Sequence, residues 1–388
     1  MKLLITSVDA IIDNETGTYF EGIKDVLNYF ESIDYDNRVV IISINQERLD
    51  SVPNDFHKLH VSGLQRKGVR FIQKINQNLE IEYKDIMVLG GKVDDMILAA
   101  NSKLIFLNAD YSKTNNPADK IFEMNYGVII AKATRLKFFF DHFLKIKEPW
   151  YYRLEIDKQT TLYGLTNAMT KIETNPDVKL ICEQLKYFLK VGVSDYKNPF
   201  LIYALMSVNQ IFNEASEINY WGYYPSSNGS ENLELKTFKE VLRRNFKSST
   251  STEDILLRIK PSIPRKSLNE DTRIKNGCDS EFDTIILNPY FEEKIKGKNV
   301  CIIDDFTNHG SSCETVRHLL QLAGVNKIIF ISLGKFRTDY KVFEYKLKGN
   351  IFAVGYSYKR IGKYTPLTGT VNKKYSQGLI DSLNDIIR

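Results

Sequence analysis

The chain has 388 residues, of which 43% are hydrophobic and 26% are charged. This composition is typical of a folded globular protein and excludes a wholly disordered, collagenous or disulfide-scaffold protein. The length predicts two or three domains. The formal net charge of +5 is small. We interpret the basic excess as dispersed along the chain, so it does not by itself indicate a nucleic-acid partner.

The cysteines and the apolar runs bear on where the protein works. The four cysteines form no C-x-x-C pair and have no zinc-like spacing with the five histidines, so we interpret them as reduced thiols. The apolar run at residues 3–8 is too short for a signal peptide, and no run approaches the roughly 20 residues of a membrane span. We therefore expect a cytoplasmic protein without a membrane partner.

Short apolar runs alternate with amphipathic segments through residues 1–147. Strands are predicted at 3–8, 39–44, 86–89 and 104–107, and helices at 22–33, 64–75 and 93–101. Strands written as continuous Val, Ile and Leu runs between helices are typical of a parallel sheet covered on both faces. We expect one doubly wound α/β domain here.

The rest of the chain predicts a helical connector at 148–197 and a second α/β domain at 198–336. The predicted strands of this domain are 218–224, 255–259, 284–287, 300–303 and 327–333, its helices are 200–212, 235–246 and 314–323, and a polar basic loop covers 260–278. Residues 337–388 are expected to extend this domain with a strand at 351–354 and a helix at 379–387. The predicted fold class is therefore α/β, with two doubly wound parallel-sheet domains joined by a helical segment.

The strongest chemical signal follows the apolar run at 300–303. Two acids, Asp304 and Asp305, come first, and a loop of small and polar residues then leads into a helix. The loop residues are Thr307, Asn308, His309, Gly310, Ser311 and Ser312. In open α/β sheets ligands bind at the carboxyl ends of strands. Loop amides, hydroxyls and a helix N-terminus suit a phosphate, while paired carboxylates suit a diol or a divalent cation. The pattern predicts a ribose 5-phosphate site.

This segment resembles the 5-phosphoribosyl-1-pyrophosphate (PRPP) motif of type I phosphoribosyltransferases, in which an apolar strand and Asp-Asp precede a Thr-Thr-Gly-x-Thr loop. The matching positions are Asp304, Asp305, Gly310 and Ser312, with Asn308 and His309 in place of the first two Thr. The resemblance implies that Asp304 and Asp305 are the catalytic acid pair. They would hold the ribose hydroxyls and also the cofactor Mg²⁺, directly or through water.

Two upstream segments are similar to ComF-like phosphoribosyltransferases, and the resemblance covers roughly residues 198–336. The first is a basic stretch like the family's flexible loop, with matching residues Arg265, Lys266, Arg273 and Asn276. The second is a turn where the family binds pyrophosphate, with residues Ser226, Ser227 and Asn228. These residue types also fit an ordinary surface loop and an ordinary turn, so both interpretations stay open.

The N-terminal domain resembles the haloacid-dehalogenase (HAD) superfamily at residues 3–9, 39–43 and 88–101. Phosphatases of that superfamily need an Asp nucleophile and Asp ligands for Mg²⁺, but Ser7 and Gly91 occupy two of those positions here. A serine cannot form an aspartyl-phosphate, so we expect a non-hydrolytic domain that can still bind a phosphorylated ligand. The remnant residues are Ser7, Asp9, Ser43 and Asp95, with Lys67 or Lys74 as the basic group.

Three functions remain open from the sequence. The first is a PRPP-dependent phosphoribosyl transferase whose acceptor the sequence does not identify. The second is a non-catalytic nucleotide sensor or effector subunit with protein partners, by analogy with bacterial stress-response or phage-defence systems. The third is direct nucleic-acid binding by Arg243, Arg244 and the basic aromatic stretches 335–348 and 356–363. Such stretches also describe a solvated surface, so nucleic acid is expected only as an indirect partner.

Overall fold

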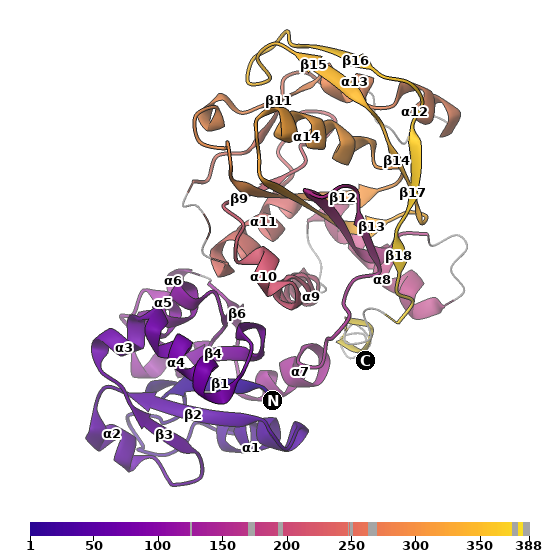
Figure 1. Ribbon diagram of the computed structural model, residues 1–388. Helices are drawn as coiled ribbons and strands as arrows, with labels where there is room; N and C mark the ends of the chain where they lie inside the picture. Colours follow the sequence, from indigo (N-terminus) through magenta and orange to yellow (C-terminus); the bar gives the residue numbers. More distant parts are fainter. Residues whose placement is uncertain are drawn as a thin grey trace. The chain divides into compact units, whose positions relative to one another are not determined.

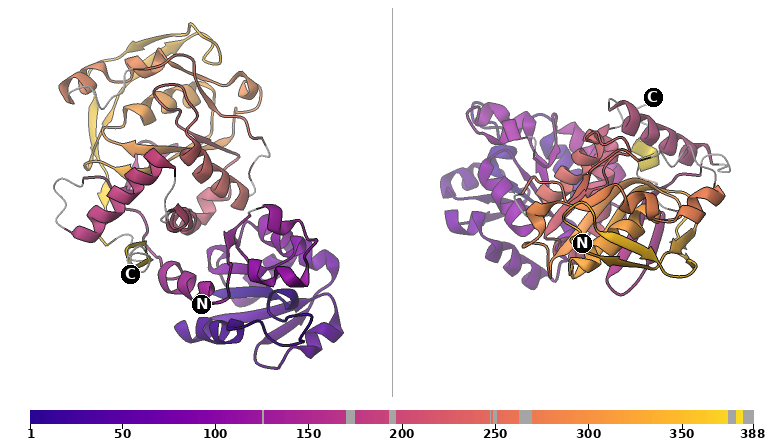
Figure 2. Two further views of the ribbon diagram at one scale, coloured as in Figure 1. Left: turned by 180° about the vertical axis from the view of Figure 1, so that it is seen from behind. Right: turned by 90° about the horizontal axis from the view of Figure 1, so that it is seen from above.

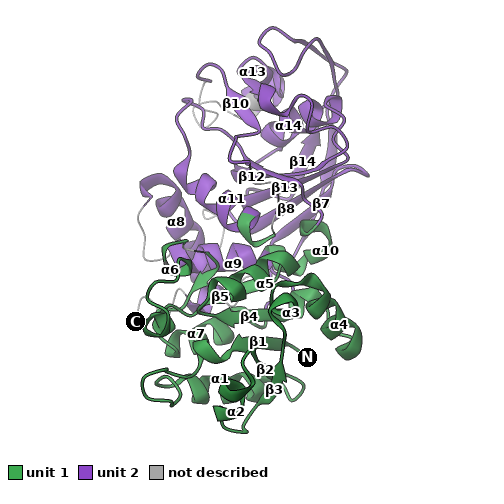
Figure 3. Ribbon diagram, turned by 90° about the vertical axis from the view of Figure 1, so that its left-hand side faces the viewer, with its two compact units in different colours: residues 1–145, 208–216, 244–247 green, residues 146–207, 217–243, 248–388 purple. Residues whose placement is uncertain are grey.

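The computed structural model describes residues 1–124, 126–169, 175–192, 197–246, 248, 251–262, 270–374 and 379–382. Its helices and strands are labelled in Figure 1. The chain forms two compact units, coloured separately in Figure 3: residues 1–145, 208–216 and 244–247 make unit 1, and the remaining residues make unit 2. Among the described residues, no helix combines the length and the apolar character needed to cross a membrane.

Unit 1 is built on a six-stranded sheet in the order β3-β2-β1-β4-β5-β6, in which every neighbouring pair is parallel. The strands are β1 (Leu3–Ser7), β2 (Arg38–Ser43), β3 (His57–His60), β4 (Ile86–Gly90), β5 (Ile105–Asn108) and β6 (Val128–Ile129). The helices are α1 (Ile23–Ile33), α2 (Gln46–Ser51), α3 (Gly63–Lys67), α4 (Val69–Leu79), α5 (Val93–Ser102), α6 (Ile121–Met124), α7 (Thr134–Phe143) and α10 (Phe212–Ala215). The strand order reverses between β1 and β4, the place where open α/β sheets bind ligands.

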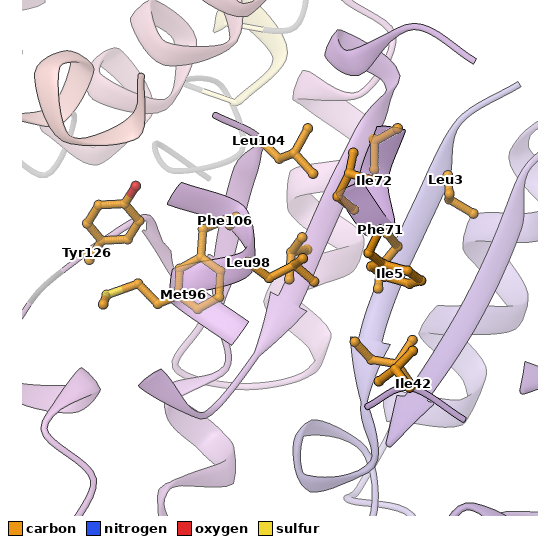
Figure 4. Close-up of a cluster of buried hydrophobic side chains, with 14 of the residues drawn as sticks. Leu3, Ile5, Ile42, Phe71, Ile72, Met96, Leu98, Leu104, Phe106 and Tyr126 are labelled. Carbon is orange, nitrogen blue, oxygen red and sulfur yellow. The ribbon is translucent and has the colours of Figure 1, made fainter. Parts of the chain in front are cut away.

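The core of unit 1 lies between this sheet and its helices. Side chains from β1, β2, β4 and β5 pack against those of α4 and α5, as Figure 4 shows for Ile5, Ile72 and Leu98. The continuous apolar runs that predicted a parallel sheet are these buried strands: every residue of β1, β4 and β5 is buried.

Unit 1 is completed by two segments that come much later in the chain. The ring of Phe212 stacks on the ring of Tyr83, with the ring centroids 5.4 Å apart and an angle of 10° between the ring planes. Asn209 Nδ2 donates to the carbonyl of Lys84 at 2.7 Å. Tyr126 donates its hydroxyl to the carbonyl of Arg244 at 2.9 Å.

Unit 2 is built on a mixed sheet in the order β18-β7-β8-β13-β12-β9. The last four strands are parallel, whereas β7 runs antiparallel to β8 and β18 antiparallel to β7. The sheet strands are β7 (Tyr152–Glu155), β8 (Thr160–Asn167), β9 (Tyr220–Tyr223), β12 (Asn299–Thr307), β13 (Lys327–Lys335) and β18 (Thr370–Val371). Figure 2 gives two further views of these strands.

Three antiparallel strand pairs and several helices complete unit 2. The pairs are β10 (Leu256–Arg258) with β11 (Ile285–Leu287), β14 (Asp339–Val342) with β17 (Thr365–Thr368), and β15 (Tyr345–Lys348) with β16 (Ser357–Arg360). The helices are α8 (Pro176–Val191), α12 (Glu270–Asn276), α13 (Asp279–Phe282) and α14 (Ser311–Leu322), together with α9 (Lys197–Gln210) and α11 (Leu233–Asn245), whose last residues are assigned to unit 1. The structure is therefore α/β, with one parallel and one mixed sheet.

The helical connector expected at 148–197 is wrong in its first half, which forms the hairpin β7–β8. In β7, Tyr152 and Leu154 are buried while Arg153 and Glu155 are exposed, the two-residue alternation of a strand. Strand β8 pairs with β7 on one side and β13 on the other. Sheet pairing of this kind depends on partners far along the chain. Among the described residues of the segment, Pro176–Val191 and Lys197, the first residue of α9, are helical.

Other boundaries also differ from the sequence prediction. The loop expected at 260–278 contains helix α12, which begins with two acidic residues as the helix dipole favours. Residues 351–354 form turns between β15 and β16 rather than a strand. The helix expected at 64–75 is interrupted at Gly68. The helix expected at 379–387 is described only for 379–382.

Candidate functional site

A cavity of about 800 Å³ lies in unit 2 at the carboxyl end of β12. Three stretches far apart in the sequence line it: residues 224–227 after β9, residues 304–312, and residues 336–337 after β13. They meet because β9, β12 and β13 are parallel neighbours, so their carboxyl ends lie at the same edge of the sheet.

Asp304 and Asp305 face this cavity from the end of β12. Strand β12 extends to Thr307, four residues beyond the predicted end, because it remains paired with β13 and the Thr307 amide donates to Ser332 Oγ at 2.9 Å. The acids therefore lie within the strand, and Asp304 is only 6% exposed. Burial, together with the neighbouring charge of Asp305, holds the pKa of Asp304 well above its usual range, and burial also raises the pKa of Asp305.

The turn after β12 forms a cradle of backbone amides at the start of α14. Gly310 caps the helix with φ of +92°, and a Cβ there would lie 2.0 Å from the ring of Tyr340. Only glycine fits this turn, both for its left-handed backbone and for the close ring. Gly310, Ser311 and Ser312 line the cavity, and the first amides of a helix have no acceptor within the helix, so this arrangement suits an anion.

His309 lines the cavity without acting as a free base in this conformation. Its Nδ1 lies 2.9 Å from Asp339 Oδ2 and 3.2 Å from Lys341 Nζ, and the Lys341 amide donates to the His309 carbonyl at 2.9 Å. These contacts to β14 fix the ring. His309, at a position where the predicted resemblance expects a threonine, thus has a structural partner on β14.

Lys335 holds the same turn in place through hydrogen bonds to backbone carbonyls. It is fully buried, and its Nζ donates to the carbonyls of Asn308 (2.7 Å), Phe336 (2.7 Å), Arg337 (3.1 Å) and Asp339 (3.0 Å). The ammonium also lies 4.8 Å from the centre of the Tyr152 ring. Burial lowers the pKa of Lys335 to about 8. One buried cation thus joins the cradle to the loop after β13.

A basic side chain that was not predicted from the sequence as a site residue also lines the cavity. Arg258, at the end of β10, has a side chain only 2% exposed and lines the cavity. It donates to Glu281 Oε2 at 3.1 Å and to Thr284 Oγ1 at 2.7 Å, while its Nε is buried without a hydrogen-bond partner among the described residues. Its position directly after the apolar run 255–257 was a signal of the same kind as the one that selected Asp304.

Some of the other predicted site residues line the cavity, and others do not or are not described. Ser226 and Ser227 line the cavity, whereas Asn228 accepts hydrogen bonds from Ser226 and Ser230 within its own turn. Thr307 lines the cavity and is buried. Asn276 ends α12, and Ile274 is the residue of that helix that lines the cavity among those whose side chains the structure describes. Arg265, Lys266 and the side chain of Arg273 lie outside the described part of the structure.

The acid pair has the donor chemistry for a magnesium ion but cannot complete a site alone. Within the described residues there is no cluster of three or more His, Cys, Asp or Glu side chains suited to a metal. Mg²⁺ prefers six oxygen ligands and is often held by one or two carboxylates together with substrate phosphates and water. Asp304, which is buried, and Asp305, which is half-buried, fit that role, because both line the cavity and neither forms an ion pair with a described residue.

The four residues of unit 1 that were predicted as HAD-like remnants lie at, or just after, the carboxyl ends of β1, β2 and β4: Ser7, Asp9, Ser43 and Asp95. Asp9 is held by two cations, Arg48 Nη1 and Lys92 Nζ, each 2.6 Å from a different carboxylate oxygen. Burial opposes its charged form, but these hydrogen bonds outweigh burial and lower the pKa of Asp9. Ser43 is buried and accepts a hydrogen bond from the Asn45 amide at 3.0 Å.

Asp95 is likewise satisfied by the protein itself. It accepts from Ser7 Oγ at 2.8 Å, Arg66 Nη2 at 2.6 Å and the Lys92 amide at 3.2 Å. Of the two expected basic groups, Lys67 pairs with Asp94 and Lys74 is exposed, whereas the neighbouring Arg66 is buried and pairs with Asp95.

Gly91 marks the missing acid of the phosphatase pattern. A Cβ at Gly91 would lie 2.2 Å from Ser112 Oγ, so the backbone has no room for an aspartate there without a shift of Ser112. In place of carboxylates that hold a cation, this edge of the sheet has carboxylates neutralised by Arg48, Arg66 and Lys92.

No family model matches the sequence, and a search of curated proteins found no match. The two family resemblances therefore depend on the motifs themselves.

Proposed function

We propose that unit 2 binds PRPP or a related ribose-5-phosphate nucleotide at the cavity beside Asp304 and Asp305, and that unit 1 is a non-hydrolytic HAD-like domain. One observation carries the proposal: the acid pair, the amide cradle of α14 and the Ser226–Ser227 turn all border a single cavity. PRPP has three parts that these features would bind. The acid pair would bind the ribose diol, the cradle would bind the 5-phosphate, and the Ser226–Ser227 turn would lie near the pyrophosphate.

Different residues of the cavity would bind different parts of the ligand. The amides of the cradle and Ser311 and Ser312 would hold the 5-phosphate, and the acid pair would accept hydrogen bonds from the ribose hydroxyls. Arg258 would face the pyrophosphate. Mg²⁺, when bound, would neutralise charge on the pyrophosphate and be held by Asp304 and Asp305 directly or through water. The protein contributes positioning and electrostatic stabilisation rather than covalent chemistry.

The volume of the cavity is consistent with such a ligand. Ligand pockets for small molecules are typically about 300–1,000 Å³, and this one is about 800 Å³. The raised pKa values of its acids are a further mark of a site, since perturbed carboxyls in a cleft cluster where ligands bind.

The test is to titrate PRPP with and without Mg²⁺ and follow both binding and pyrophosphate release. The doubly substituted Asp304→Asn/Asp305→Asn protein should lose binding at least tenfold. The exposed pair Glu292→Gln/Glu293→Gln is the matched control, because it also removes two adjacent carboxylates from unit 2 but lies outside the cavity. Equal binding by all three proteins would contradict the proposal.

The second candidate is a nucleotide sensor or effector subunit, which the neutralised acids of unit 1 favour. Binding without pyrophosphate release, for every acceptor base offered, would support the sensor. Release of pyrophosphate would support the transferase.

A further inference from the structure

The basic excess of this protein is concentrated in one segment. Residues 337–374 contain nine lysines and arginines and only two acids, Asp339 and Glu344, which gives a formal charge of +7 against +5 for the whole chain. The expectation that the excess is dispersed is therefore wrong. The rest of the chain is slightly acidic.

Part of this segment is the two-stranded ribbon β15–β16, whose register separates two faces. Alternate residues of a strand point to opposite sides. The inward face is engaged with the protein: Tyr345 donates its hydroxyl to Asp279 at 2.6 Å, Tyr358 donates to Asp283 at 2.8 Å, and Arg360 donates to the Lys275 carbonyl at 2.9 Å. The aromatic rings are thus occupied by packing within unit 2.

The outward face carries the lysines. Lys346, Lys348 and Lys359 are all exposed, and we call these three residues the lysine face. Lys346 and Lys359 are directly opposite each other in the register, and none of the three forms an ion pair with a described residue. The one acid on this side is Glu344, at the end of the ribbon and opposite Ile361.

Like charges directly opposite each other on a sheet are destabilising. The lysine face therefore stores a repulsion that a polyanion with regularly spaced charges would relieve. The Arg243 and Arg244 pair does not extend it, because Arg243 is bound to Glu240 on its own helix.

We propose that the lysine face docks on the phosphate backbone of double-helical DNA without regard to base sequence. A two-stranded ribbon has dimensions that the major groove of B-DNA admits, and lysine acts toward phosphate as a point charge. With the aromatic rings turned inward, the ribbon offers no platform for stacking unpaired bases. This favours a duplex over a single strand and phosphate contacts over base contacts. The inference is independent of the PRPP site, which none of these lysines lines.

The experiment measures binding of the full chain to two unrelated duplexes of about 20 base pairs by fluorescence anisotropy over a salt series. The test variant is Lys346→Glu/Lys348→Glu/Lys359→Glu. The matched control is Lys158→Glu/Lys179→Glu/Lys296→Glu, which makes the same change of charge at exposed lysines elsewhere in unit 2. Circular dichroism and the melting temperature establish that both variants fold.

We expect the wild type to bind both duplexes equally and the control to bind nearly as well. The test variant should bind at least tenfold more weakly. Its slope of log K against log salt should be smaller by about 0.9 for each lysine that contacts a phosphate, hence by up to about 2.7.

Four results would overturn the proposal. These are no duplex binding at low salt, an equal loss in test and control variants, tighter binding of single-stranded RNA, and equal binding of polyglutamate. The last would identify an acidic protein surface as the partner.

Discussion

At the scale of single residues, the adjacent acids of β12 stand out because no described residue forms an ion pair with them. Asp9 and Asp95 in unit 1 each have a bound cation, whereas Asp304 and Asp305 share a buried cavity wall and accept hydrogen bonds mainly from backbone amides. Natural sites often retain such unfavourable groups because function needs them. The energetic cost should therefore be measurable.

We predict that Asp304→Asn stabilises the protein at neutral pH while removing ligand binding. A carboxyl whose pKa is raised in the folded state binds a proton more tightly there than in the unfolded chain, so the free energy of unfolding falls as pH rises above the ordinary carboxyl range. The melting temperature should rise at pH 7.5, by about 2–4 °C for each kcal/mol of relieved repulsion, and change little at pH 4. Glu292→Gln, at an exposed acid, should change neither. A lower melting temperature at pH 7.5 would refute the prediction.

We predict that Gly310→Ala breaks the cradle. The new Cβ would meet the ring of Tyr340, and the residue would keep a left-handed backbone. The expected cost is about 2–5 kcal/mol in urea unfolding, with loss of PRPP affinity. Gly297→Ala is the control, since Gly297 is also left-handed (φ +71°) but has open space around its Cβ position; it should cost about 1–2 kcal/mol and leave affinity unchanged. Similar effects of the two substitutions would show that the ring contact is unimportant.

At the scale of elements, the site depends on how β12, β13 and the turn between β12 and α14 are tied together. Lys335 lies at the last position of β13 and reaches the carbonyl of Asn308 in that turn. The same ammonium holds the loop that leads to β14. The Lys335 side chain thus joins the cradle to the sheet, in addition to the pairing of β12 with β13.

We predict that Lys335→Met destabilises unit 2 by about 3 kcal/mol or more, because four carbonyls lose their shared donor at about 1–3 kcal/mol for each buried group left unsatisfied. Burial lowers the pKa of Lys335 to about 8, so the folded chain binds this proton less tightly than the unfolded chain. Raising the pH from 8 to 10 should therefore add a stabilising contribution in the wild type that is absent from the variant. Urea unfolding across that pH range measures both effects. Lys298→Met, at an exposed position, should show neither.

The sequence allowed the prediction of elements whose pattern is local. The apolar runs of β1, β4, β12 and β13 mark buried parallel strands, and most of the helices between them follow from the same periodicity. The hairpin β7–β8 was missed because its identity depends on pairing with β13. The acids of β12 could be selected from their place after an apolar run. Lys335, like Arg48 and Lys92 in unit 1, could not be selected, because ion pairs and cavity walls join residues that are distant in sequence. Arg258 also follows an apolar run, so its place in the sequence carried a signal of the same kind as that of the acids.

At the scale of the whole molecule, the two units should respond differently to ligand. Hydrogen exchange with PRPP and Mg²⁺ should protect the amides of the cradle at residues 309–312, because the phosphate would occupy their donors. Residues 1–124 of unit 1 should be unaffected, since Asp9 and Asp95 are already neutralised within the protein. Protection confined to the edge of the unit 1 sheet would instead place the ligand at the HAD-like remnant. The doubly substituted Asp304→Asn/Asp305→Asn protein provides the baseline.

The discontinuity of unit 1 has a consequence for how the protein is made. When residue 147 leaves the ribosome, the sheet of unit 1 is fully synthesised, yet the segments 208–216 and 244–247 that complete the unit are still to be translated. Until then the ring of Tyr83 lacks its stacking partner Phe212, and Tyr126 lacks the carbonyl that its hydroxyl binds. The first unit of the nascent chain therefore finishes folding only after part of the second has emerged, and a gene fragment ending at codon 147 would encode an incomplete unit.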